Sequence, residues 1–439
     1  MQSANQNIKP LTTKINEKGN LSIGGCDLAE LAKKYSTPLY VIDKETLVSI
    51  AREYKNAFKS YAKFKPKFAS KALMTSAIAK ILADEGYGFD VVSGGEIYTV
   101  HNAGISLNNS TFNGNNKSRE ELNLAIDLGI GRISVDNFSE LELLNEILEE
   151  KNKTQKILLR VTPGIECHTH EYIQTGHLDS KFGFDLTQID NVIELITQKY
   201  KNLEIMGLHA HVGSQIFETK VWSDEVEVLI KEIKRIKDKF KIELEEINIG
   251  GGLGITYTKE DTPPSVQEVA NVVLKSLEEN IKKYNVKEPV LYIEPGRSMV
   301  GTSGVTLYTL GSSKQVPNGK KYIAVDGGMA DNIRPSMYGA EYCAELVTKK
   351  DSETKQKVTI AGKFCESGDI LIKEIELNNP QKGDILCVYN TGAYGYSMAS
   401  NYNLMLKPMM VLVNNSQSAI IVNRQTYAQL VQNDIIAEI

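Results

Sequence analysis

Between residues 65 and 297, short apolar or β-branched runs alternate with longer segments in which apolar residues recur at helical spacing. Eight of the runs have the length of buried strands: residues 65–71, 88–93, 110–114, 132–136, 156–161, 204–212, 244–250 and 289–295. Alternation of strands and helices predicts a parallel sheet, and eight such units over this length predict a closed (β/α)8 TIM barrel.

An open, doubly wound sheet is the alternative arrangement of the same elements. In that fold the Gly-rich turn follows the first strand, whereas here residues 250–254 (GGGLG) follow the seventh. The position of the glycines therefore favours the barrel. Several helix starts carry capping pairs three residues apart, which are Ser93 with Glu96, Ser118 with Glu121 and Asn137 with Glu140.

After residue 300 the helical periodicity fades, and strand-like runs follow one another at short spacing. These runs predict a second, mostly β domain of sandwich or barrel-like form. The strand-like residues 38–43 (PLYVID) have no place in a barrel whose eight strands are assigned, so we expect them in the β domain. The predicted domains are residues 45–300 for the barrel, and residues 1–44 with 301–439 for the β domain.

Composition narrows the class of protein. The chain has 439 residues, of which 41% are hydrophobic and 24% charged, and these values exclude disordered and fibrous proteins. The net charge is −5 and the basic residues are scattered, so we expect no nucleic-acid or membrane partner. Five widely spaced cysteines fit reduced thiols. With no apolar run near ~20 residues and no signal-peptide core, we expect a cytoplasmic protein.

Ionisable side chains gather at the carboxyl ends of the predicted strands, where barrel enzymes place their active sites. They are Lys71, Asp90, Arg160, His209, His211, Glu294 and Arg297, with the polar Ser214 beside them. Gly250, Gly251 and Gly252 follow the seventh strand, and Pro295 and Gly296 follow the eighth. Barrels that bind phosphate use these two loops, because Gly-rich turns present backbone N–H groups to the anion. A tight turn that needs positive φ is the alternative explanation of the glycines.

Three residues beside this loop predict the cofactor pyridoxal 5′-phosphate and no metal. Lys71, behind an apolar stretch, would lose hydration and could attack a carbonyl as the free amine. Glu294 can keep a pyridine nitrogen protonated, and His211 can stack on the ring. Each residue on its own could be explained without a cofactor: Lys71 as a solvated lysine at a strand edge, and His211 as a core histidine. The combination indicates the cofactor.

Motifs along residues 25–435 resemble those of the diaminopimelate decarboxylases, fold-type III pyridoxal phosphate enzymes related to alanine racemase and the eukaryotic-type ornithine decarboxylases. In chain order the motifs are FASKAL (68–73), FDVVSGGE (89–96), GNNKS (114–118), HEYIQTG (170–176), DSKFGF (179–184), GLHAHVGSQI (207–216), GGGLGI (250–255), EPGR (294–297), DGGMADNIRPSMYGA (326–340), CESGD (365–369) and GAYGY (392–396). The resemblance implies decarboxylation of meso-2,6-diaminopimelate to L-lysine and CO2, the last step of bacterial lysine biosynthesis.

The resemblance also implies roles for single residues. Lys71 matches the lysine that holds the cofactor covalently, His211 the residue that stacks on its ring, and Glu294 the partner of its pyridine nitrogen. The other cofactor contacts that it implies are Asp90, Ser214, Gly250, Gly251, Gly252, Pro295, Gly296, Arg297 and Tyr394. The role of Cys167 stays open.

For the substrate, the resemblance implies contacts from Arg297, Arg334, Tyr338, Glu366 and Tyr394. Guanidinium groups match a distal carboxylate, which ornithine lacks, and Glu366 matches a distal ammonium. Cys365 and Glu366 resemble a pair that the partner subunit inserts into the site, so the resemblance implies a homodimer with shared active sites. Cys365 or Lys71 then donates the proton to the product.

Three other functions stay open at this point. A decarboxylase of the same fold could act on ornithine, arginine or carboxynorspermidine. An amino-acid racemase could use the same barrel and β domain. A non-catalytic protein could bind pyridoxal phosphate without turnover, although such a protein would be free to lose Lys71, Glu294, Cys365 and Glu366.

Overall fold

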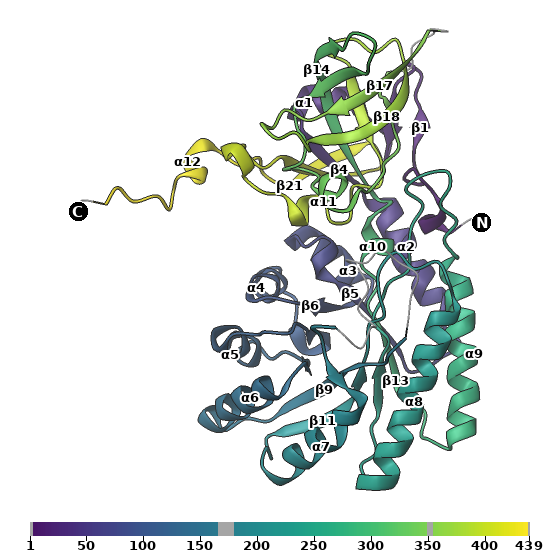
Figure 1. Ribbon diagram of the computed structural model, residues 1–439, viewed down its shortest axis with the longest axis vertical. Helices are drawn as coiled ribbons and strands as arrows, with labels where there is room; N and C mark the ends of the chain where they lie inside the picture. The colour runs from purple at the N-terminus through teal and green to yellow at the C-terminus, as the bar shows by residue number, and fades with distance from the viewer. Residues whose placement is uncertain (1–2, 166–179, 349–353, 438–439) are drawn as a thin grey trace. The chain divides into compact units, whose positions relative to one another are not determined.

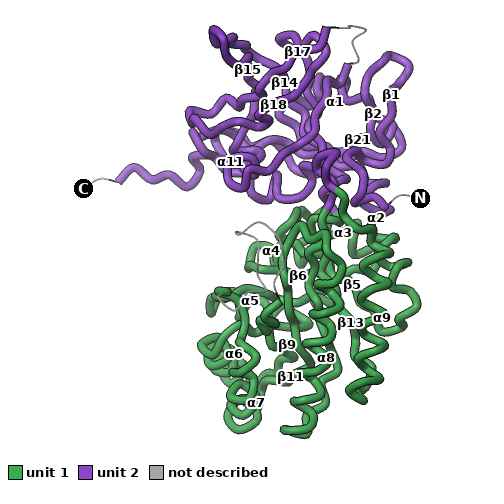
Figure 2. Tube along the Cα trace, turned by 45° about the vertical axis from the view of Figure 1, so that its right-hand side comes forward, with its two compact units in different colours: residues 1, 50–254, 262–299 green, residues 2–49, 255–261, 300–439 purple. Residues whose placement is uncertain are grey.

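The computed structural model describes residues 3–165, 180–348 and 354–437, and the chain divides into two units (Figure 2). Unit 1 contains residues 50–254 and 262–299. Unit 2 contains the chain up to residue 49, residues 255–261 and the chain from residue 300. Residues 45–49, 255–261 and 300 thus lie in unit 2, although the sequence pattern places them in the barrel domain. Cys167 and the motif at 170–176 lie outside the described residues.

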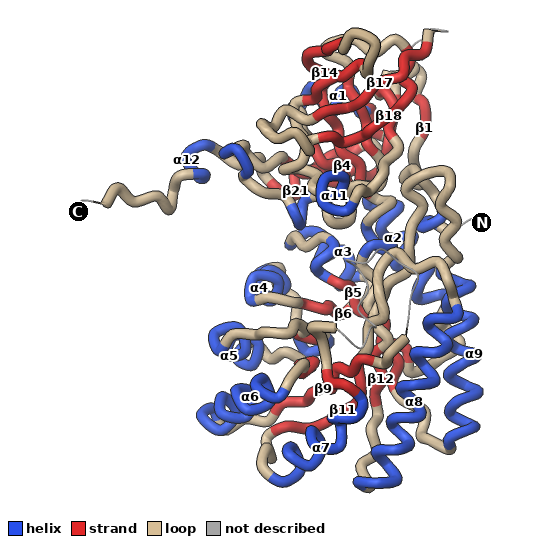
Figure 3. The backbone as a smooth tube through the Cα atoms, in the orientation of Figure 1, coloured by secondary structure: helices blue, strands red, loops and turns tan. Residues whose placement is uncertain are grey.

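Unit 1 is a closed parallel barrel (Figure 3). In the described residues, eight strands form the ring, and the two-residue strand β10 (Phe184–Asp185) pairs with β9 in addition to them. The strands of the ring are β5 (Phe64–Ala69), β6 (Gly88–Val91), β7 (Thr111–Phe112), β8 (Arg132–Val135), β9 (Gln155–Thr162), β11 (Leu203–His209), β12 (Glu246–Asn248) and β13 (Val290–Ile293). Pairing of β8 with β9 and of β13 with β5 closes the ring. Each strand falls within or over one of the predicted runs, and the predicted fold class is confirmed.

Helices follow the strands and lie on the outside of the barrel (Figure 1). They are α3 (Ser76–Asp84), α4 (Gly94–Asn102), α5 (Arg119–Asp127), α6 (Phe138–Lys151), α7 (Ile189–Gln198), α8 (Lys220–Phe240) and α9 (Val266–Tyr284). The predicted caps are confirmed, because the side chains of Ser93, Ser118 and Asn137 accept from the backbone N–H three residues on. Two further helices complete the set: α2 (Lys44–Ala57) precedes β5, and the short α10 (Arg297–Val300) follows β13.

Unit 2 is built mainly of strands from both ends of the chain. They are β1 (Lys14–Ile15), β2 (Leu21–Ile23), β3 (Cys26–Asp27), β4 (Leu39–Asp43), β14 (Gly304–Gln315), β15 (Lys321–Val325), β16 (Ala344–Leu346), β17 (Lys355–Ala361), β18 (Ile370–Asn378), β19 (Ile385–Val388), β20 (Met409–Asn414) and β21 (Gln417–Val422). Strand β4 pairs with β14 on one side and β20 on the other, so the expectation for residues 38–43 is confirmed. The short helices are α1 (Leu28–Tyr35), α11 (Arg334–Tyr338) and α12 (Tyr427–Leu430).

Strand β18 is absent from the sequence-based prediction. Lys373, Glu374 and Glu376 interrupt its apolar residues, and all three are exposed. Leu371, Ile372 and Leu377 belong to the apolar core of the sheet. A strand with one face in solvent can carry charged residues on that face without burying them. Because these charges interrupt the apolar run, the strand is missed when strands are identified by apolar runs.

Candidate active site

Glu294 lies at the end of β13, inside the mouth of the barrel, and is 6% exposed. Asn248, at the end of β12, donates from Nδ2 to its Oε1 at 2.5 Å. His209, at the end of β11, has Nε2 at 3.3 Å from its Oε2. Asn113, just after β7, has Nδ2 at 3.5 Å from Oε1. Groups from three other strands therefore hold this carboxylate in one orientation.

The same neighbours keep the Glu294 carboxylate ionised. Burial alone disfavours the charged form of the carboxylate, but the contact with His209, the charge of Lys67 and the hydrogen bond of Asn248 outweigh it. Together they hold the pKa of Glu294 below its usual value. The barrel therefore presents a fixed negative charge at the strand ends.

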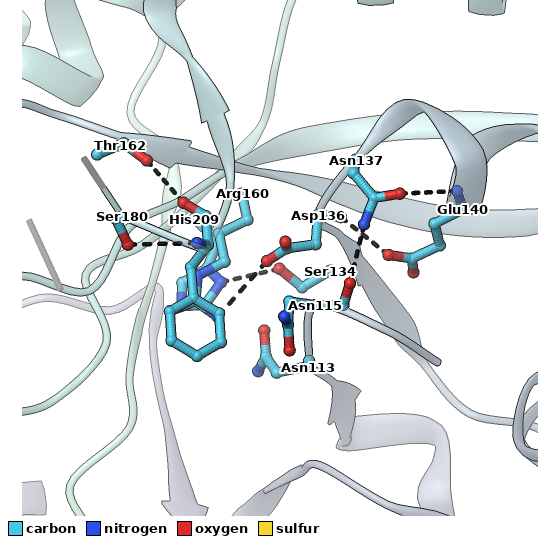
Figure 4. A network of polar contacts seen from close by, with 12 residues as sticks. Asn113, Asn115, Ser134, Asp136, Asn137, Glu140, Arg160, Thr162, Ser180 and His209 are labelled. Carbon is cyan, nitrogen blue, oxygen red and sulfur yellow. Dashed lines mark hydrogen bonds and ion pairs between the residues drawn. The ribbon is translucent and has the colours of Figure 1, made fainter. Parts of the chain in front are cut away.

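His209 joins Glu294 to Ser134 on β8, and Figure 4 shows His209 and Ser134 facing each other. Its Nδ1 lies 2.8 Å from the Ser134 hydroxyl, and burial lowers the pKa of the imidazole, so the ring is neutral. If the Ser134 hydroxyl donates to Nδ1, the remaining proton is on Nε2 and faces Glu294. The sequence pattern predicts His209 at the strand end but indicates no role for it. Its two-residue spacing from His211, which puts both on the same side of the chain, was the available signal.

Arg160 on β9 lies in the same layer (Figure 4). Its Nη1 is 3.7 Å from the Asp136 carboxylate, and its guanidinium lies over the Phe182 ring at 4.2 Å. Nearby, Asn113 donates to Asp90 at 2.5 Å. Burial and the neighbouring Glu294 raise the pKa of Asp90 to about 7, against the pull of Lys71.

Lys71 follows β5 in a single 3-10 turn, Ser70–Ala72, and its side chain is exposed. The expectation that an apolar stretch would dehydrate Lys71 is therefore wrong: the apolar residues before it point into the barrel wall, and Lys71 itself lies beyond them. Its positive charge acts to lower the pKa values of Asp90, Glu96 and His211. Burial, with Lys71 and other cations, lowers the pKa of His211, so that imidazole is neutral.

The glycine loop after β12 is shaped by its own hydrogen bonds. Gly250 donates to Asn248 Oδ1 at 2.9 Å, and Gly251 donates to His211 Nδ1 at 3.3 Å. Gly252 has φ +109°, and a Cβ there would lie 2.6 Å from the Gly213 carbonyl oxygen. A Cβ on Gly251 would lie 2.3 Å from the Glu294 carbonyl oxygen. A larger residue at either position would displace the loop.

On the other side of this loop, Arg297 Nη2 donates to Ser214 Oγ at 2.9 Å, and the guanidinium is buried. Pro295 and Gly296 lie between Glu294 and Arg297, with the Pro295 carbonyl accepting from Ala69 N–H at 3.1 Å. Unit 1 thus brings together the predicted residues Lys71, Asp90, His211, Ser214, Gly250, Gly251, Gly252, Glu294, Pro295, Gly296 and Arg297.

Unit 2 carries the remaining predicted residues. Arg334, at the start of α11, is buried: its Nη1 donates to the Tyr342 hydroxyl at 2.6 Å, and its guanidinium lies over the Tyr257 ring at 4.8 Å. Tyr394 acts electrostatically on Arg334. Tyr338, which ends α11, is partly exposed.

Cys365 and Glu366 are exposed on a tight turn between β17 and β18. Asp369 anchors this turn, because its carboxylate accepts from the N–H of Phe364 at 2.9 Å and of Met329 at 2.7 Å. Cys365 N–H donates to Asn403 Oδ1 at 2.8 Å. The turn is held rigidly, with both predicted side chains directed to solvent.

Asp331, three residues before Arg334, predicts a measurable pH dependence of stability. Burial and the neighbouring carboxylates raise its pKa to about 7, against a hydrogen bond from Gly328 N–H. Between pH 4 and 7 the folded protein keeps a proton that the unfolded chain has lost, so this group destabilises the fold increasingly as pH rises. We expect Asp331→Asn to remove that slope and to raise the free energy of unfolding at pH 7 by about 1–3 kcal/mol.

Urea unfolding at pH 4.5, 5.5, 6.5 and 7.5 would measure this effect, with Asp434→Asn, an exposed carboxylate, as the control. Equal slopes for Asp331→Asn and the parent protein would contradict the assignment.

The residues of unit 1 fit pyridoxal phosphate. Lys71 supplies an amine for the aldehyde and Glu294 an ionised acceptor for the pyridine N–H. The glycine loop offers backbone N–H groups with no Cβ atoms to block an anion, and the Arg297–Ser214 pair adds a guanidinium and a hydroxyl. His211 supplies a neutral ring. A barrel with this set at its strand ends defines the class of pyridoxal-phosphate-dependent barrel enzymes.

Comparison with known proteins supports the class and narrows it. Residues 47–301 match the family model described as the pyridoxal-dependent decarboxylase, pyridoxal binding domain. A diaminopimelate decarboxylase of Bacillus methanolicus is 48% identical over 94% of this chain and 96% of its own. One of Bacillus subtilis (strain 168) is 45% identical, with 97% of each chain covered. The chain belongs to the diaminopimelate decarboxylase family of pyridoxal-dependent decarboxylases.

Solved structures agree with the sequence relatives. The diaminopimelate decarboxylase of M. jannaschii, crystallised in co-complex with L-lysine, has a TM-score of 0.91 and 35% identity, with 98% of each chain covered. The predictions of a decarboxylase and of a pyridoxal phosphate cofactor are confirmed.

Proposed function

We propose that this chain removes CO2 from meso-2,6-diaminopimelate and releases L-lysine. The observation that carries the proposal is the near-full-length identity to relatives named for this reaction. The ionised Glu294 supports it, because a carboxylate can keep the pyridine nitrogen of the cofactor protonated. The buried Arg334 supports it as well, because its guanidinium can bind a carboxylate.

Different residues of the chain bind the cofactor, orient its ring and keep its pyridine nitrogen protonated. Bound pyridoxal phosphate supplies the sink for the electron pair left at Cα when CO2 departs. Glu294 keeps the proton on the pyridine nitrogen, and His211 orients the ring. Gly252, Ser214 and Arg297 bind the phosphate, with the other predicted loop residues shaping their positions.

Two groups are candidates for moving the proton at Cα. Lys71 would hold the cofactor through its amine, and the same amine could return a proton to Cα. Cys365 is the other candidate donor. Activity retained in Cys365→Ala would leave Lys71 as the donor.

At the distal end of the substrate, we propose that Arg334, Arg297, Tyr338 and Tyr394 bind the carboxylate and that Glu366 binds the ammonium. Arg334 is the strongest member of this set, since the Tyr257 ring and the Tyr342 hydroxyl fix its guanidinium plane. A fixed plane suits bidentate binding of a carboxylate.

Release of CO2 from single substrates tests the function. The enzyme is incubated separately with meso-diaminopimelate, ornithine and arginine, and CO2 is measured. We expect release from diaminopimelate alone. Release mainly from ornithine or arginine would establish the alternative decarboxylase, and inversion of an amino acid without CO2 would establish a racemase. Cofactor absorbance with no turnover of any of them would establish a binding protein.

Arg334→Ala is expected to lower kcat/KM for diaminopimelate by about 100-fold, mostly through KM. This is the loss of one charge-assisted contact, about 3 kcal/mol. Steady-state CO2 release measures it. Tyr342→Phe is the matched control, since it removes the hydroxyl that contacts Arg334 and leaves the cation. Full affinity for diaminopimelate in Arg334→Ala would favour the ornithine or arginine decarboxylase.

We further propose a homodimer in the cytoplasm, in which Cys365 and Glu366 complete the site of the partner. Their exposure on an anchored turn supports this arrangement. In the described part of the chain, no helix has the length and apolar character needed to cross a membrane.

Mixed dimers test the shared site. Inactive Lys71→Ala and impaired Glu366→Ala chains are co-expressed with different tags and the heterodimer is purified. If sites are shared, one of the two sites contains neither substitution, and activity returns. A heterodimer no more active than the two parents together, or an active monomer in gel filtration, would refute the proposal.

A further inference from the structure

A second lysine of β5, Lys67, is buried inside the barrel at 1% exposure. Its Nζ donates to the Thr111 hydroxyl on β7 and lies 4.0 Å from the centroid of the Tyr292 ring on β13. Both of these partners are neutral. A buried ammonium with neutral contacts is costly unless an anion lies nearby.

The charges around Lys67 show which anion that is. Glu246 is already neutralised, because Arg132 binds both of its oxygens, at 2.6 and 2.9 Å. Asp136 lies beside Arg160, and Asp90, whose pKa is raised to about 7, carries only part of a negative charge near neutral pH. Glu294 has hydrogen-bond donors but no arginine or lysine within ion-pair distance among the described residues. Glu294 is therefore the remaining anion without an arginine or lysine partner among the described residues, and Lys67 is the cation that balances its charge.

Strand register leads to the same pair. In the β5–β13 ladder, Tyr292 is opposite Lys65 and Ile293 is opposite Pro66. The next step places Glu294 opposite Lys67. Residues opposite each other on parallel strands point to the same face, and the contact of Lys67 with Tyr292 shows that this face is the barrel interior.

We propose that Lys67 is a positioning residue that keeps Glu294 in its carboxylate form, and so sets the strength with which the barrel binds the protonated pyridine ring of the cofactor. The inference rests on the proposed contact between Glu294 and the pyridine nitrogen. Lys67 itself touches neither cofactor nor substrate in this proposal; it acts through the carboxylate.

The titration behaviour of the two groups agrees with this role. The Lys67 charge is among the causes that lower the pKa of Glu294, and burial lowers the pKa of Lys67 to about 8 while Glu294 works against that shift. Without the cation, burial would raise the pKa of Glu294. The other charged or titratable groups that face this pair are Asp90 on β6, Arg132 on β8, Arg160 on β9, His209 on β11, His211 just after β11, Glu225 on α8 and Glu246 on β12.

The binding of pyridoxal phosphate to the cofactor-free enzyme tests the proposal. The single tryptophan of the chain, Trp222, is a built-in probe, since its Nε1 lies 3.4 Å from the Gly251 carbonyl oxygen. Quenching of its fluorescence during titration with pyridoxal phosphate gives Kd. We expect Lys67→Met to raise Kd about tenfold at pH 6–7, the factor for one pKa unit above the assay pH.

The pH profile separates an electrostatic role from a structural one. In the parent enzyme Glu294 stays ionised from pH 6 to 9. In Lys67→Met the carboxyl gains its charge only as pH rises, and in the parent Lys67 loses its charge above about pH 8. Ionisation of Glu294 in the variant and loss of the Lys67 charge in the parent both make the Kd values of Lys67→Met and the parent converge at high pH. A ratio that stays constant from pH 6 to 9, or no difference at pH 6, would overturn the proposal.

Two control variants complete the experiment. Thr111→Val removes the hydrogen bond of Lys67 but leaves its charge, and we expect Kd within about threefold of the parent. Glu294→Gln carries no charge to protect, so Lys67→Met should add no further loss to it. Additive losses would overturn the inference. Should Lys67→Met fail to fold, Lys67→Gln removes the charge and keeps a donor for Thr111.

The same measurements distinguish failure of the proposed contact between Glu294 and the pyridine nitrogen from failure of the Lys67 inference. Glu294→Gln with the parent Kd would refute the contact itself, and the Lys67 inference with it. Weakened binding in Glu294→Gln together with unchanged binding in Lys67→Met would refute the Lys67 inference alone.

Discussion

Lys71→Ala is expected to lower CO2 release from diaminopimelate by at least about 10³-fold, more than 4 kcal/mol of lost transition-state stabilisation. Lys71 is the amine at the strand ends whose charge acts on Asp90, Glu96 and His211. Its side chain is exposed, so its removal leaves the core intact, and we expect the free energy of unfolding to change by less than about 0.5 kcal/mol. Single-turnover assays and urea unfolding measure the two quantities.

Two further variants make the Lys71 result specific. Lys71→Arg keeps the positive charge but lacks a nucleophilic amine, so it should be as inactive as Lys71→Ala. Lys80→Ala removes an exposed lysine of α3 that pairs with Asp84, and it should have parent activity. Turnover at the normal rate in Lys71→Ala with pyridoxal phosphate present would overturn the proposed role.

The barrel strands could be predicted because each carries its own short apolar run. The position of the glycine loop after the seventh run then chose the closed barrel over the open sheet. These are local signals that need no knowledge of neighbouring strands. Strand β18 lacks such a local signal, because its charged residues lie on a solvated face and its burial comes from pairing with β17.

The two lysines of β5 show where sequence reasoning fails in the site. The apolar stretch before Lys71 suggested dehydration there, yet Lys71 is exposed and Lys67 is buried. A lysine within a strand is ordinarily interpreted as facing solvent. Only closure of the barrel by β13 encloses Lys67, and the anion that it balances lies 227 positions further along the chain. No local pattern contains that information.

Glu294→Gln is expected to lower kcat by about 100-fold or more, the scale found when one group that stabilises developing charge is removed. The amide keeps the shape of the side chain and can still accept from Asn248. On its other side, the His209 ring can accept from the amide if its proton moves to Nδ1, where the Ser134 hydroxyl accepts. The geometry therefore survives, and the variant tests the charge.

The charge of Glu294 also predicts an effect on the cofactor-free protein. In Glu294→Gln the ammonium of Lys67 remains buried without its anion, so we expect the free energy of unfolding at pH 7 to fall by about 1–3 kcal/mol. Adding Lys67→Met should restore stability, because Met fills similar volume without a charge, while kcat stays low. Recovery of stability without recovery of activity would show that one carboxylate serves both the fold and the reaction. A stable, fully active Glu294→Gln enzyme would refute both roles.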